Sequence, residues 1–305
     1  MRRSVCVILN PAAGQTRRKT LDAAIRDQFD AADWKYTIRE LTEAERVGAV
    51  TREVISGECD LVVAAGGDGT VCGVAEGLVG SGIPMGIIPT GTGNILAQDL
   101  GIPLSVRESL ALLVGPHKLR AIDAMKSVNP DPAHDRYYFL NISIGMSSAV
   151  MVDTHSTQKR KLGMFAYVFT GLRKLAGLQA TLFDLGIDDQ RQRVRATDIV
   201  IANSGVVGLS QLRLDRHITV DDGEVSVCII RARSAITYIQ MLGSTLLNRK
   251  PTRGLWCIPA HTRVRIAADR PLPVQADGEA IGRQQVEIIV VPHAVSIIVP
   301  AMEIR

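Results

Sequence analysis

A short apolar run that changes abruptly into a glycine-rich turn is the feature that most constrains this chain. Asp60-Leu61-Val62-Val63-Ala64-Ala65 is followed directly by Gly66-Gly67-Asp68-Gly69-Thr70. The apolar run predicts a buried strand, and the glycines predict a tight turn into a helix that begins at Thr70 and Val71. Glycines let an anion approach the backbone, and the first N–H groups of a helix are unpaired. The run therefore predicts a phosphate site.

An ordinary strand-to-helix connection is the alternative interpretation of two glycines alone. Asp68 favours chemistry over this alternative, because a carboxylate beside a bound phosphate repels it unless Mg²⁺ or a hydroxyl proton lies between them. The turn thus indicates phosphoryl transfer more than simple anchoring of a phosphate.

A second glycine-rich motif narrows the interpretation. Pro89-Thr90-Gly91-Thr92-Gly93-Asn94, taken with the Gly66 to Thr70 turn, resembles the diacylglycerol kinase catalytic-domain family, which includes sphingosine kinases and bacterial lipid kinases. The glycine-aspartate turn also occurs in NAD kinases and, in a variant form, in phosphofructokinases. NAD kinases lack the second motif at this distance, so the resemblance is to lipid kinases. Asn10-Pro11-Ala12-Ala13-Gly14 matches a third element of the family.

The resemblance implies an ATP site built from these corners. In parallel sheets ligands collect beyond the carboxyl ends of the strands, where all three corners are expected to fall. The family also has a threonine after the second strand that contacts the nucleotide, here Thr42, although Thr42 and Glu45 also predict a capping box for a helix running towards Ser56. The predicted nucleotide-binding residues are Asn10, Pro11, Ala12, Ala13, Gly14, Thr42, Gly66, Gly67, Asp68, Gly69, Thr70, Val71, Cys72 and Thr92.

The length of 305 residues predicts two domains. Alternating strands and helices over residues 1–124 predict an α/β domain with a parallel sheet, which the resemblance implies is of the NAD kinase and phosphofructokinase type, with residues 300–305 returning to it. Strand-like segments between residues 125 and 299 predict an antiparallel β-sandwich that receives the lipid or other acceptor; they cover residues 137–144, 180–187, 198–202, 224–230, 262–267, 286–291 and 295–299. Residues 159–175 instead predict an amphipathic helix with basic ends, which packs on the sandwich or docks on an anionic membrane.

Composition restricts the partners and the compartment. Aromatic residues make up 4% of the chain and the formal net charge is +4, which argues against nucleic acid as a partner. The five cysteines are odd in number and scattered, so we expect reduced thiols and a cytoplasmic protein. Apolar runs are too short for a transmembrane segment, so contact with lipid is expected to be peripheral, during turnover. A homodimer is left open.

Two carboxylates are candidates for the chemistry. A lipid hydroxyl needs a proton acceptor, and the resemblance implies that Glu279, after the Asp277-Gly278 turn, fills this role from the interdomain cleft. Asp68 would then organise Mg²⁺, although in sphingosine kinases the aspartate has been viewed as the base, and so the two roles stay open. The resemblance also implies a structural Mg²⁺ at an acidic turn, held by the carboxylate of Asp222 and the backbone carbonyls of Thr219 and Glu224.

The sequence therefore predicts a cytoplasmic, ATP-dependent lipid kinase that phosphorylates a hydroxyl of diacylglycerol or a related lipid at the membrane face. Two rivals remain. One is a kinase of a soluble acceptor such as NAD or a sugar phosphate, which the second motif opposes. The other is a catalytically silent lipid-binding or regulatory protein, which the presence of Asp68, Thr92 and Glu279 opposes.

Overall fold

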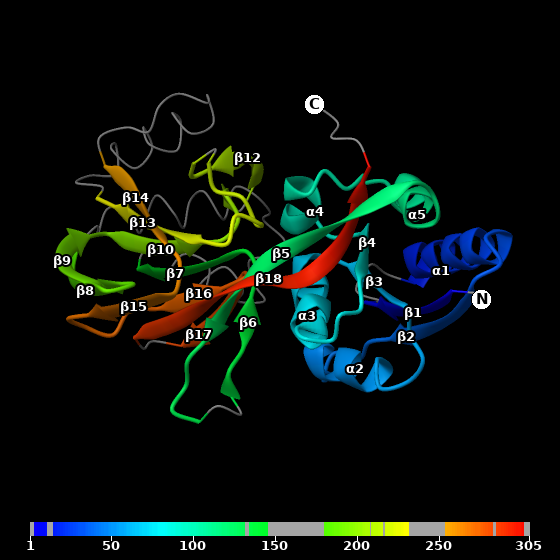
Figure 1. The fold of residues 1–305 in the computed structure, drawn as a ribbon, viewed down its shortest axis with the longest axis horizontal. Coiled ribbons are helices and arrows are strands. Elements are labelled where there is room, and N and C mark those ends of the chain that lie inside the picture. The colour runs from blue at the N-terminus through cyan, green and yellow to red at the C-terminus, as the bar shows by residue number, and fades with distance from the viewer. Residues whose placement is uncertain are drawn as a thin grey trace. The chain divides into compact units, whose positions relative to one another are not determined.

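The computed structural model describes residues 3–10, 15–131, 134–145, 180–207, 209–215, 217–231, 254–282 and 285–301. The chain forms two compact units: unit 1 comprises Met1–Asp123 and His293–Arg305, and unit 2 comprises Ala124–Pro292. The chain passes from one unit to the other within β5 (His117–Ser127) and again within β18 (Val286–Pro300) (Figure 1). The amphipathic helix predicted over residues 159–175 lies outside the described residues.

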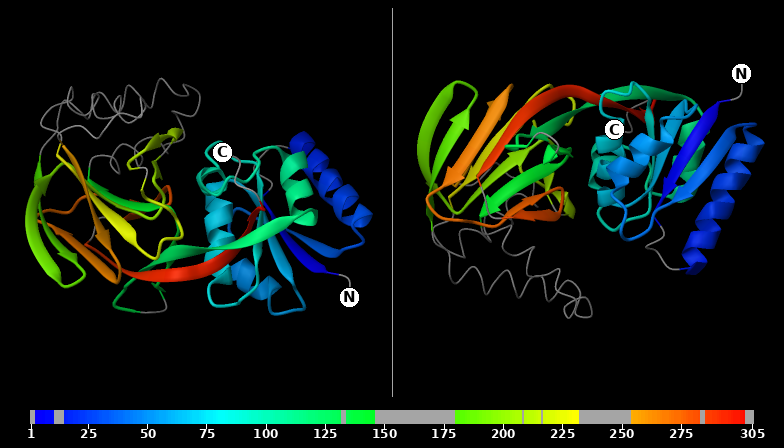
Figure 2. Two further views of the ribbon diagram at one scale, coloured as in Figure 1. Left: turned by 45° about the horizontal axis from the view of Figure 1, so that its top comes forward. Right: turned by 90° about the horizontal axis from the view of Figure 1, so that it is seen from below.

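Unit 1 alternates strands and helices. Its elements before β5 are β1 (Ser4–Leu9), α1 (Gln15–Ala31), β2 (Lys35–Glu40), α2 (Val47–Val54), β3 (Leu61–Gly66), α3 (Asp68–Leu78), β4 (Met85–Pro89), α4 (Ile95–Asp99) and α5 (Val106–Val114). The strands pair in the order β2-β1-β3-β4, all parallel, and the last part of β18 pairs in parallel with β4. Helices α1 and α5 lie on one face of this sheet and α3 on the other (Figure 2). The predicted parallel α/β fold is confirmed.

The position of α3 follows from the small residues on its surface. Every residue of β3 is buried, as expected for a strand covered by helices on both faces. On its other side α3 packs against α2 through glycines: a Cβ on Gly73 would lie 2.6 Å from the Cβ of Val47, and one on Gly77 would lie 2.3 Å from the Cβ of Thr51. Larger residues at these glycines would force the two helices apart. The glycines therefore determine how closely α3 packs against α2, and with it the direction of α3.

Unit 2 is an antiparallel β-sandwich. Its elements after β5 are β6 (Tyr137–Tyr138), β7 (Asn141–Gly145), β8 (Thr181–Ile187), β9 (Gln190–Ala196), β10 (Asp198–Ala202), β11 (Val206–Val207), β12 (Leu209–Arg213), β13 (Val225–Ile230), β14 (Leu255–Ala260), β15 (Arg263–Ala268), β16 (Val274–Ala276) and β17 (Glu279–Gly282). One sheet has the order β14-β13-β10-β7-β16-β17 and the other β18-β15-β8-β9, and all of these neighbours are antiparallel. Buried aliphatic side chains from both sheets form one core, which confirms the predicted sandwich.

Two differences from the predicted strands have simple causes. The segments predicted as two strands near the C-terminus are one strand, β18, which pairs with β15 as far as Ile289 and with β4 at Ile297. Strand β9 was not predicted, because its sequence, Gln190-Arg191-Gln192-Arg193-Val194-Arg195-Ala196, is mostly polar. Only Val194 and Ala196 of β9 are buried, so the hydrophobic pattern that marks a strand is short.

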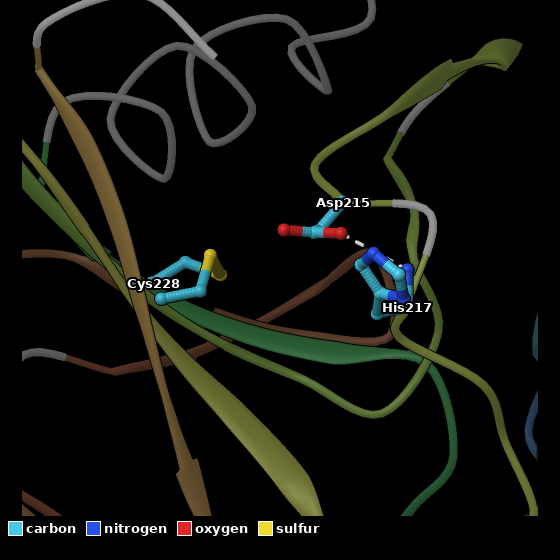
Figure 3. Close-up of a disulfide and its surroundings, with 4 residues drawn as sticks. Asp215, His217 and Cys228 are labelled. Carbon is cyan, nitrogen blue, oxygen red and sulfur yellow. Dashed lines mark hydrogen bonds between the residues drawn. A yellow bond between two sulfur atoms is a disulfide. The ribbon is translucent and has the colours of Figure 1, made fainter. Parts of the chain in front are cut away.

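The cysteines are not all reduced. Cys228 on β13 stands directly opposite Cys257 on β14, and the two form a disulfide (Figure 3). Leu214 and Ile218 pack in the same small hydrophobic cluster, and between them the N–H of His217 donates to Asp215 Oδ1 at 2.9 Å. Cys6, Cys59 and Cys72 are free. The expectation of five reduced thiols is therefore wrong, because the cross-strand register that joins two cysteines 29 residues apart is not visible in their spacing.

Candidate functional site

The carboxyl ends of four parallel strands of unit 1 form one straight edge. In the sheet register Glu40 is opposite Leu9, Leu9 is opposite Ala65, and Ala65 is opposite Ile88. Backbone hydrogen bonds extend this line by one residue, from the N–H of Asn10 to the carbonyl of Ala65 at 3.0 Å. The loops that follow all four strands therefore start side by side, at the edge where parallel sheets bind ligands.

The glycine-rich turn after β3 is shaped by contacts that leave no room for side chains. A Cβ on Gly66 would lie 2.5 Å from the Cβ of Thr70, so Thr70 packs directly over the backbone of Gly66 and is buried. Its hydroxyl accepts a hydrogen bond from Asn10 Nδ2 at 2.9 Å, which joins the loop after β1 to the loop after β3. Asn10 and Thr70, both predicted site residues, are thus in direct contact.

The second glycine motif folds against the first. The Cα of Gly67 would lie 2.5 Å from a Cβ on Gly91, a distance that only two glycines allow. Asn94 closes its own loop in the left-handed region (φ 49°), because its Oδ1 accepts from the N–H of Gly91 at 3.0 Å and its Nδ2 donates to the carbonyl of Gly91 at 2.9 Å. Thr92, the residue of this loop that was predicted to bind the nucleotide, is exposed.

Asp68 connects the two glycine loops. Its Oδ1 accepts a hydrogen bond from the N–H of Ile95 at 2.6 Å, and a Cβ on Gly93 would lie 2.6 Å from its Oδ2. Burial raises the pKa of the Asp68 carboxyl above its usual value, although the backbone N–H groups of residues 94–96 oppose this shift. The side chain therefore has a structural role that the sequence did not reveal: it ties the start of α4 to the start of α3.

The first turn of α3 fits a phosphate group. The helix begins at Asp68, two residues earlier than predicted, and the N–H groups of Thr70 and Val71 both bond to the carbonyl of Gly67. Gly69 is exposed, and a Cβ placed on it would meet nothing within 4 Å. The N-terminus of an eleven-residue helix thus faces open space at a position without a side chain, which suits the phosphates of ATP.

The other predicted nucleotide residues differ in how they can take part. Pro11, Ala12, Ala13 and Gly14 lie outside the described residues. Val71 and Cys72 are buried in α3, with 3% and 6% of their surfaces exposed, so their side chains face the interior. Thr42 is exposed in the loop after β2, where the N–H of Leu41 still bonds to the carbonyl of Leu9 at 2.9 Å.

The predicted capping box at Thr42 and Glu45 is wrong. Helix α2 begins at Val47, and its N-cap, Arg46, makes no side-chain cap. The Glu45 carboxylate instead accepts from the N–H of Thr42 at 2.8 Å and from its hydroxyl at 3.0 Å, within a turn that precedes the helix. These bonds lower the pKa of Glu45, and Arg39 pairs with the same carboxylate. The ion pair joins the turn to β2, a contact that the local motif does not indicate.

In unit 2, Glu279 follows a rigid hairpin. Asp277 (φ 47°) and Gly278 (φ 88°) form the two-residue turn between β16 and β17, as an Asp-Gly pair favours. The Asp277 carboxylate also accepts three backbone hydrogen bonds, from Phe139 at 2.8 Å, Leu140 at 2.9 Å and Asn141 at 3.1 Å. Glu279, the first residue of β17, is exposed. The hairpin was predicted, whereas the anchoring role of Asp277 was not.

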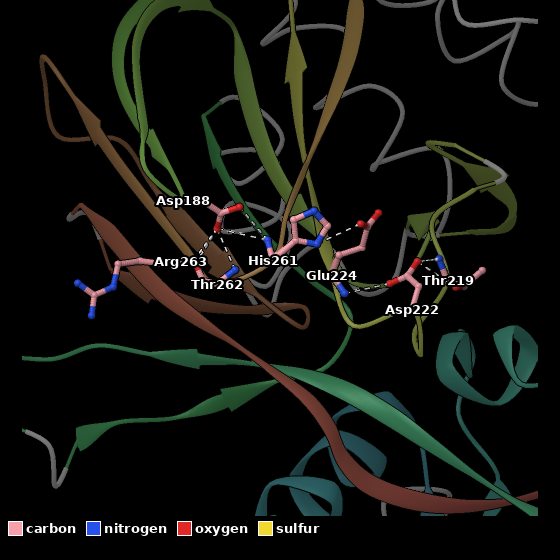
Figure 4. Close-up of polar contacts among 7 residues, drawn as sticks. All are labelled: Asp188, Thr219, Asp222, Glu224, His261, Thr262 and Arg263. Atoms are coloured by element: carbon pink, nitrogen blue, oxygen red, sulfur yellow. Dashed lines mark hydrogen bonds and ion pairs between the residues drawn. The ribbon is translucent and has the colours of Figure 1, made fainter.

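The acidic turn predicted to hold a structural Mg²⁺ lies before β13. Asp222 Oδ2 accepts from the N–H and hydroxyl of Thr219 at 3.3 and 3.0 Å, and Oδ1 accepts from the N–H of Glu224 at 3.2 Å (Figure 4). Oδ1 therefore keeps one acceptor site for a cation. Across the described residues there is no group of three or more His, Cys, Asp or Glu side chains that could hold a metal. The predicted site differs from such a group, because it uses one carboxylate and two backbone carbonyls. The absence of such a group therefore does not test it, and it stays a prediction.

Sequence reasoning missed three residues of the site region: Gly91, Gly93 and Asn94 were quoted as part of a motif but given no role. The roles of Gly91 and Gly93 depend on contacts with Gly67 and Asp68, more than twenty residues earlier in the chain, and Asn94 closes the loop that carries both glycines. The one local signal in the sequence is the residue type of Asn94, since Asn adopts the left-handed region, found here, more readily than most residues.

Together these observations describe unit 1 as a parallel α/β unit with aligned strand ends, two glycine loops in contact and an open position at the start of α3. Family models agree with this description. Residues 4–127 match the diacylglycerol kinase catalytic domain, and residues 141–299 match the YegS C-terminal NAD kinase beta sandwich-like domain.

Individual proteins show the same similarity. The chain is 30% identical to a probable lipid kinase YegS-like of Stenotrophomonas maltophilia (strain K279a), over 96% of this chain and 92% of that one. It is 26% identical to a diacylglycerol kinase of Bacillus subtilis (strain 168), over 96% and 95%. A crystal structure of a putative diacylglycerol kinase from Bacillus anthracis str. Sterne has the same fold, with a TM-score of 0.79, 22% identity and coverage of 98% and 96%. The chain therefore belongs to the diacylglycerol kinase catalytic-domain family of lipid kinases.

Proposed function

We propose that this chain is an ATP-dependent kinase that transfers the γ-phosphoryl group to a hydroxyl of diacylglycerol or a related lipid. The observation that carries the proposal is the direct connection between the two glycine loops. Asp68 bonds to the N–H of Ile95, and Gly67 lies against Gly91, so the motif shared with NAD kinases and the motif typical of lipid kinases are in direct contact.

The residues of unit 1 have separate tasks in this proposal. The first N–H groups of α3 face the phosphates, and Gly69 leaves the space that they require. The exposed hydroxyl of Thr92 provides a further donor from the second loop. Asp68 holds the two loops together through the N–H of Ile95, and the proposal gives its carboxylate the further task of organising the cation that accompanies ATP. When bound, Mg²⁺ and ATP supply the phosphoryl group and neutralise its charge.

Glu279 is the proposed proton acceptor. It is an exposed carboxylate at the start of β17, directly after a hairpin that Asp277 fixes through three backbone hydrogen bonds. A rigid support of this kind holds a base in one orientation, which general base catalysis requires. In the proposed reaction a Glu279 carboxylate oxygen would take the proton of the lipid hydroxyl while the hydroxyl oxygen attacks the γ-phosphorus of ATP. The bond from that phosphorus to the β–γ bridging oxygen would break, and ADP would leave.

The membrane is expected to be the source of the acceptor. Of the helices in the described part of the chain, none has the length and hydrophobicity to cross a bilayer. We propose peripheral contact with lipid during turnover, without nucleic acid as a partner.

The test measures release of ADP from ATP and Mg²⁺, with and without mixed micelles that contain diacylglycerol. We expect turnover that depends on the lipid and falls in Glu279→Gln. Glu58→Gln is a matched control, since Glu58 is also exposed and its side chain lies outside the site. Turnover on NAD without lipid would support the soluble-acceptor alternative. A folded protein with no turnover on any acceptor would support a silent lipid-binding protein.

A further inference from the structure

The outer face of one sheet of unit 2 carries an unusual number of arginines. Side chains alternate between the core and the solvent along each strand of the sheet β18-β15-β8-β9. The outward positions of β9 are Arg191, Arg193 and Arg195, and those of β15 include Arg263 and Arg265. Arginine therefore occupies this face on two strands that are not neighbours.

Protection of a sheet edge explains only part of this pattern. Strand β9 is the last strand of its sheet, and charged side chains on such a strand prevent pairing with other chains. Strand β15 is not an edge strand, because β18 and β8 pair with it on either side. The arginines of β15 thus need another explanation.

Gly186 on β8 leaves an open place between the two arginine strands. In the sheet register it is opposite Arg191 on one side and Arg265 on the other. Its φ is not in the positive range, and a Cβ on it would lie 3.5 Å from the Cβ of Arg265, an ordinary contact. The backbone does not require glycine here, and glycine weakens the interior of a strand. The missing side chain keeps a surface cavity open.

That cavity has a volume of about 600 Å³ and both signs of charge around it. It is lined by Gly186, Asp188, Asp189, Arg191, Thr262, Arg263, Arg265, Glu287 and Ile289. Two of its carboxylates interact with other residues of the same lining. Glu287 lies 3.4 Å from Arg263 and 3.9 Å from Arg265, so one acid orients two arginines.

Asp188 also lines the cavity, and neighbouring donors occupy its carboxylate. Its Oδ1 accepts from the N–H of Thr262 at 2.8 Å, from the Thr262 hydroxyl at 2.7 Å and from the N–H of Arg263 at 3.1 Å, while the Arg263 side chain extends in the other direction (Figure 4). Asp189 stands at the exposed tip of the β8–β9 hairpin. No ion pair of Arg191 is found within the described residues, so this guanidinium is available to a ligand.

We propose that this cavity binds a phosphate group between Arg191 and Arg265, over the backbone of Gly186. Strands are about 4.8 Å apart, so the two arginines start about 10 Å from each other, and their side chains can close on an anion of phosphate size. The phosphate belongs to a phospholipid headgroup or to a soluble phosphate compound. The site is separate from the nucleotide site and does not depend on the proposed kinase function.

Two binding measurements distinguish the two sources. Calorimetry with inorganic phosphate tests the soluble ligand, and co-sedimentation with vesicles of phosphatidylglycerol, compared with vesicles of phosphatidylcholine, tests the headgroup. Gly186→Val fills the floor without a change of charge and suits a strand, so the melting temperature should not fall. Arg191→Gln removes one guanidinium. Each variant should weaken binding about tenfold or more.

Arg195→Gln is the matched control, because Arg195 lies on the same face of β9 and does not line the cavity. Its effect should stay within about twofold, the size expected from a screened surface charge. Binding of phosphate alone identifies a soluble ligand, and binding of vesicles alone identifies the headgroup. The proposal is overturned if neither ligand binds, if Gly186→Val binds like the parent, or if Arg195→Gln loses as much as Arg191→Gln.

Discussion

Replacement of Gly69 by alanine should raise the stability of the fold and lower its affinity for ATP. Gly69 is the second residue of α3, is exposed, and has open space where a Cβ would point. A methyl group there meets no atom of the described protein, so the fold does not oppose it. The same methyl group occupies the space next to the N–H groups that face the proposed phosphate.

The two effects have opposite signs and can be estimated. Alanine in place of glycine stabilises a helix interior by about 1 kcal/mol, and we expect about 0.5 kcal/mol in the first turn. That change corresponds to a rise in melting temperature of about 1–2 °C. Loss of one hydrogen bond to a charged phosphate oxygen costs about 1.5–3 kcal/mol, so the dissociation constant for ATP should rise about 10-fold to 100-fold.

Calorimetry with ATP and Mg²⁺, together with thermal unfolding in the absence of ligand, measures both quantities. Gly57→Ala is the control. A Cβ on Gly57 would lie 3.8 Å from the carbonyl oxygen of Val54, an ordinary contact, and Gly57 is not part of the loops that follow the strands. It should leave ATP affinity unchanged. If Gly69→Ala is folded and binds ATP as tightly as the parent does, the phosphates do not lie at the start of α3.

Three further predictions concern carboxylates. Burial raises the pKa of Asp68, so the native carboxyl takes up a proton at a higher pH than the unfolded one. Its contribution to the free energy of unfolding therefore grows as the pH falls and is lost as the pH rises through the raised pKa. Asp68→Asn should remove this pH dependence, measured by urea unfolding. Burial would raise the pKa of Asp188, but hydrogen bonds led by the Thr262 hydroxyl hold it at about 2. Asp188→Asn should therefore cost about 1 kcal/mol at neutral pH, after allowance for solvent screening, and the cost should vanish as the pH falls from about 4 to about 2. Glu279→Gln should lower turnover about 10²-fold to 10⁴-fold with ATP affinity unchanged.

Each of these predictions has a clear contrary result. A stability difference between Asp68→Asn and the parent that is the same at about pH 4.5 and about pH 7.5 would contradict the raised pKa. A cost of Asp188→Asn that persists near pH 2 would show that the hydrogen bonds do not depend on the charge. Suppose that Glu279→Gln turns over like the parent, whereas Asp68→Asn loses nearly all turnover and its residual rate depends on Mg²⁺ as the parent's does. The roles of the two carboxylates must then be exchanged.

Local patterns were enough to predict the corners of the site. The apolar run before Gly66 and the glycines after it predict a strand and a turn, and parallel pairing then places the loop after β1 beside the loop after β3. The contact between Asn10 and Thr70 follows from that arrangement. The hairpin at Asp277 and Gly278 was equally visible, because an Asp-Gly pair favours the positive φ values of a two-residue turn.

Contacts between distant segments were beyond such patterns. The bond between Asp68 and the N–H of Ile95 joins residues 27 apart, and nothing in either local sequence indicates it. The disulfide depends on the register of two strands, and the carboxylate of Glu45, predicted to cap a helix, is paired with Arg39 of β2. Local propensity predicts the helices and strands. The helix caps, the pairing of the cysteines and the role of Asp68 depend on packing between those elements.

Transfer of a labelled γ-phosphoryl group from ATP to lipid tests the central claim most directly. The protein is incubated with γ-labelled ATP, Mg²⁺ and micelles of diacylglycerol, and the organic and aqueous phases are then separated. The proposed function predicts label in a phosphorylated lipid in the organic phase, with little label there when Glu279→Gln replaces the parent. Label that is found only in a soluble phosphorylated acceptor or in inorganic phosphate, with lipid present and the protein folded, would contradict it.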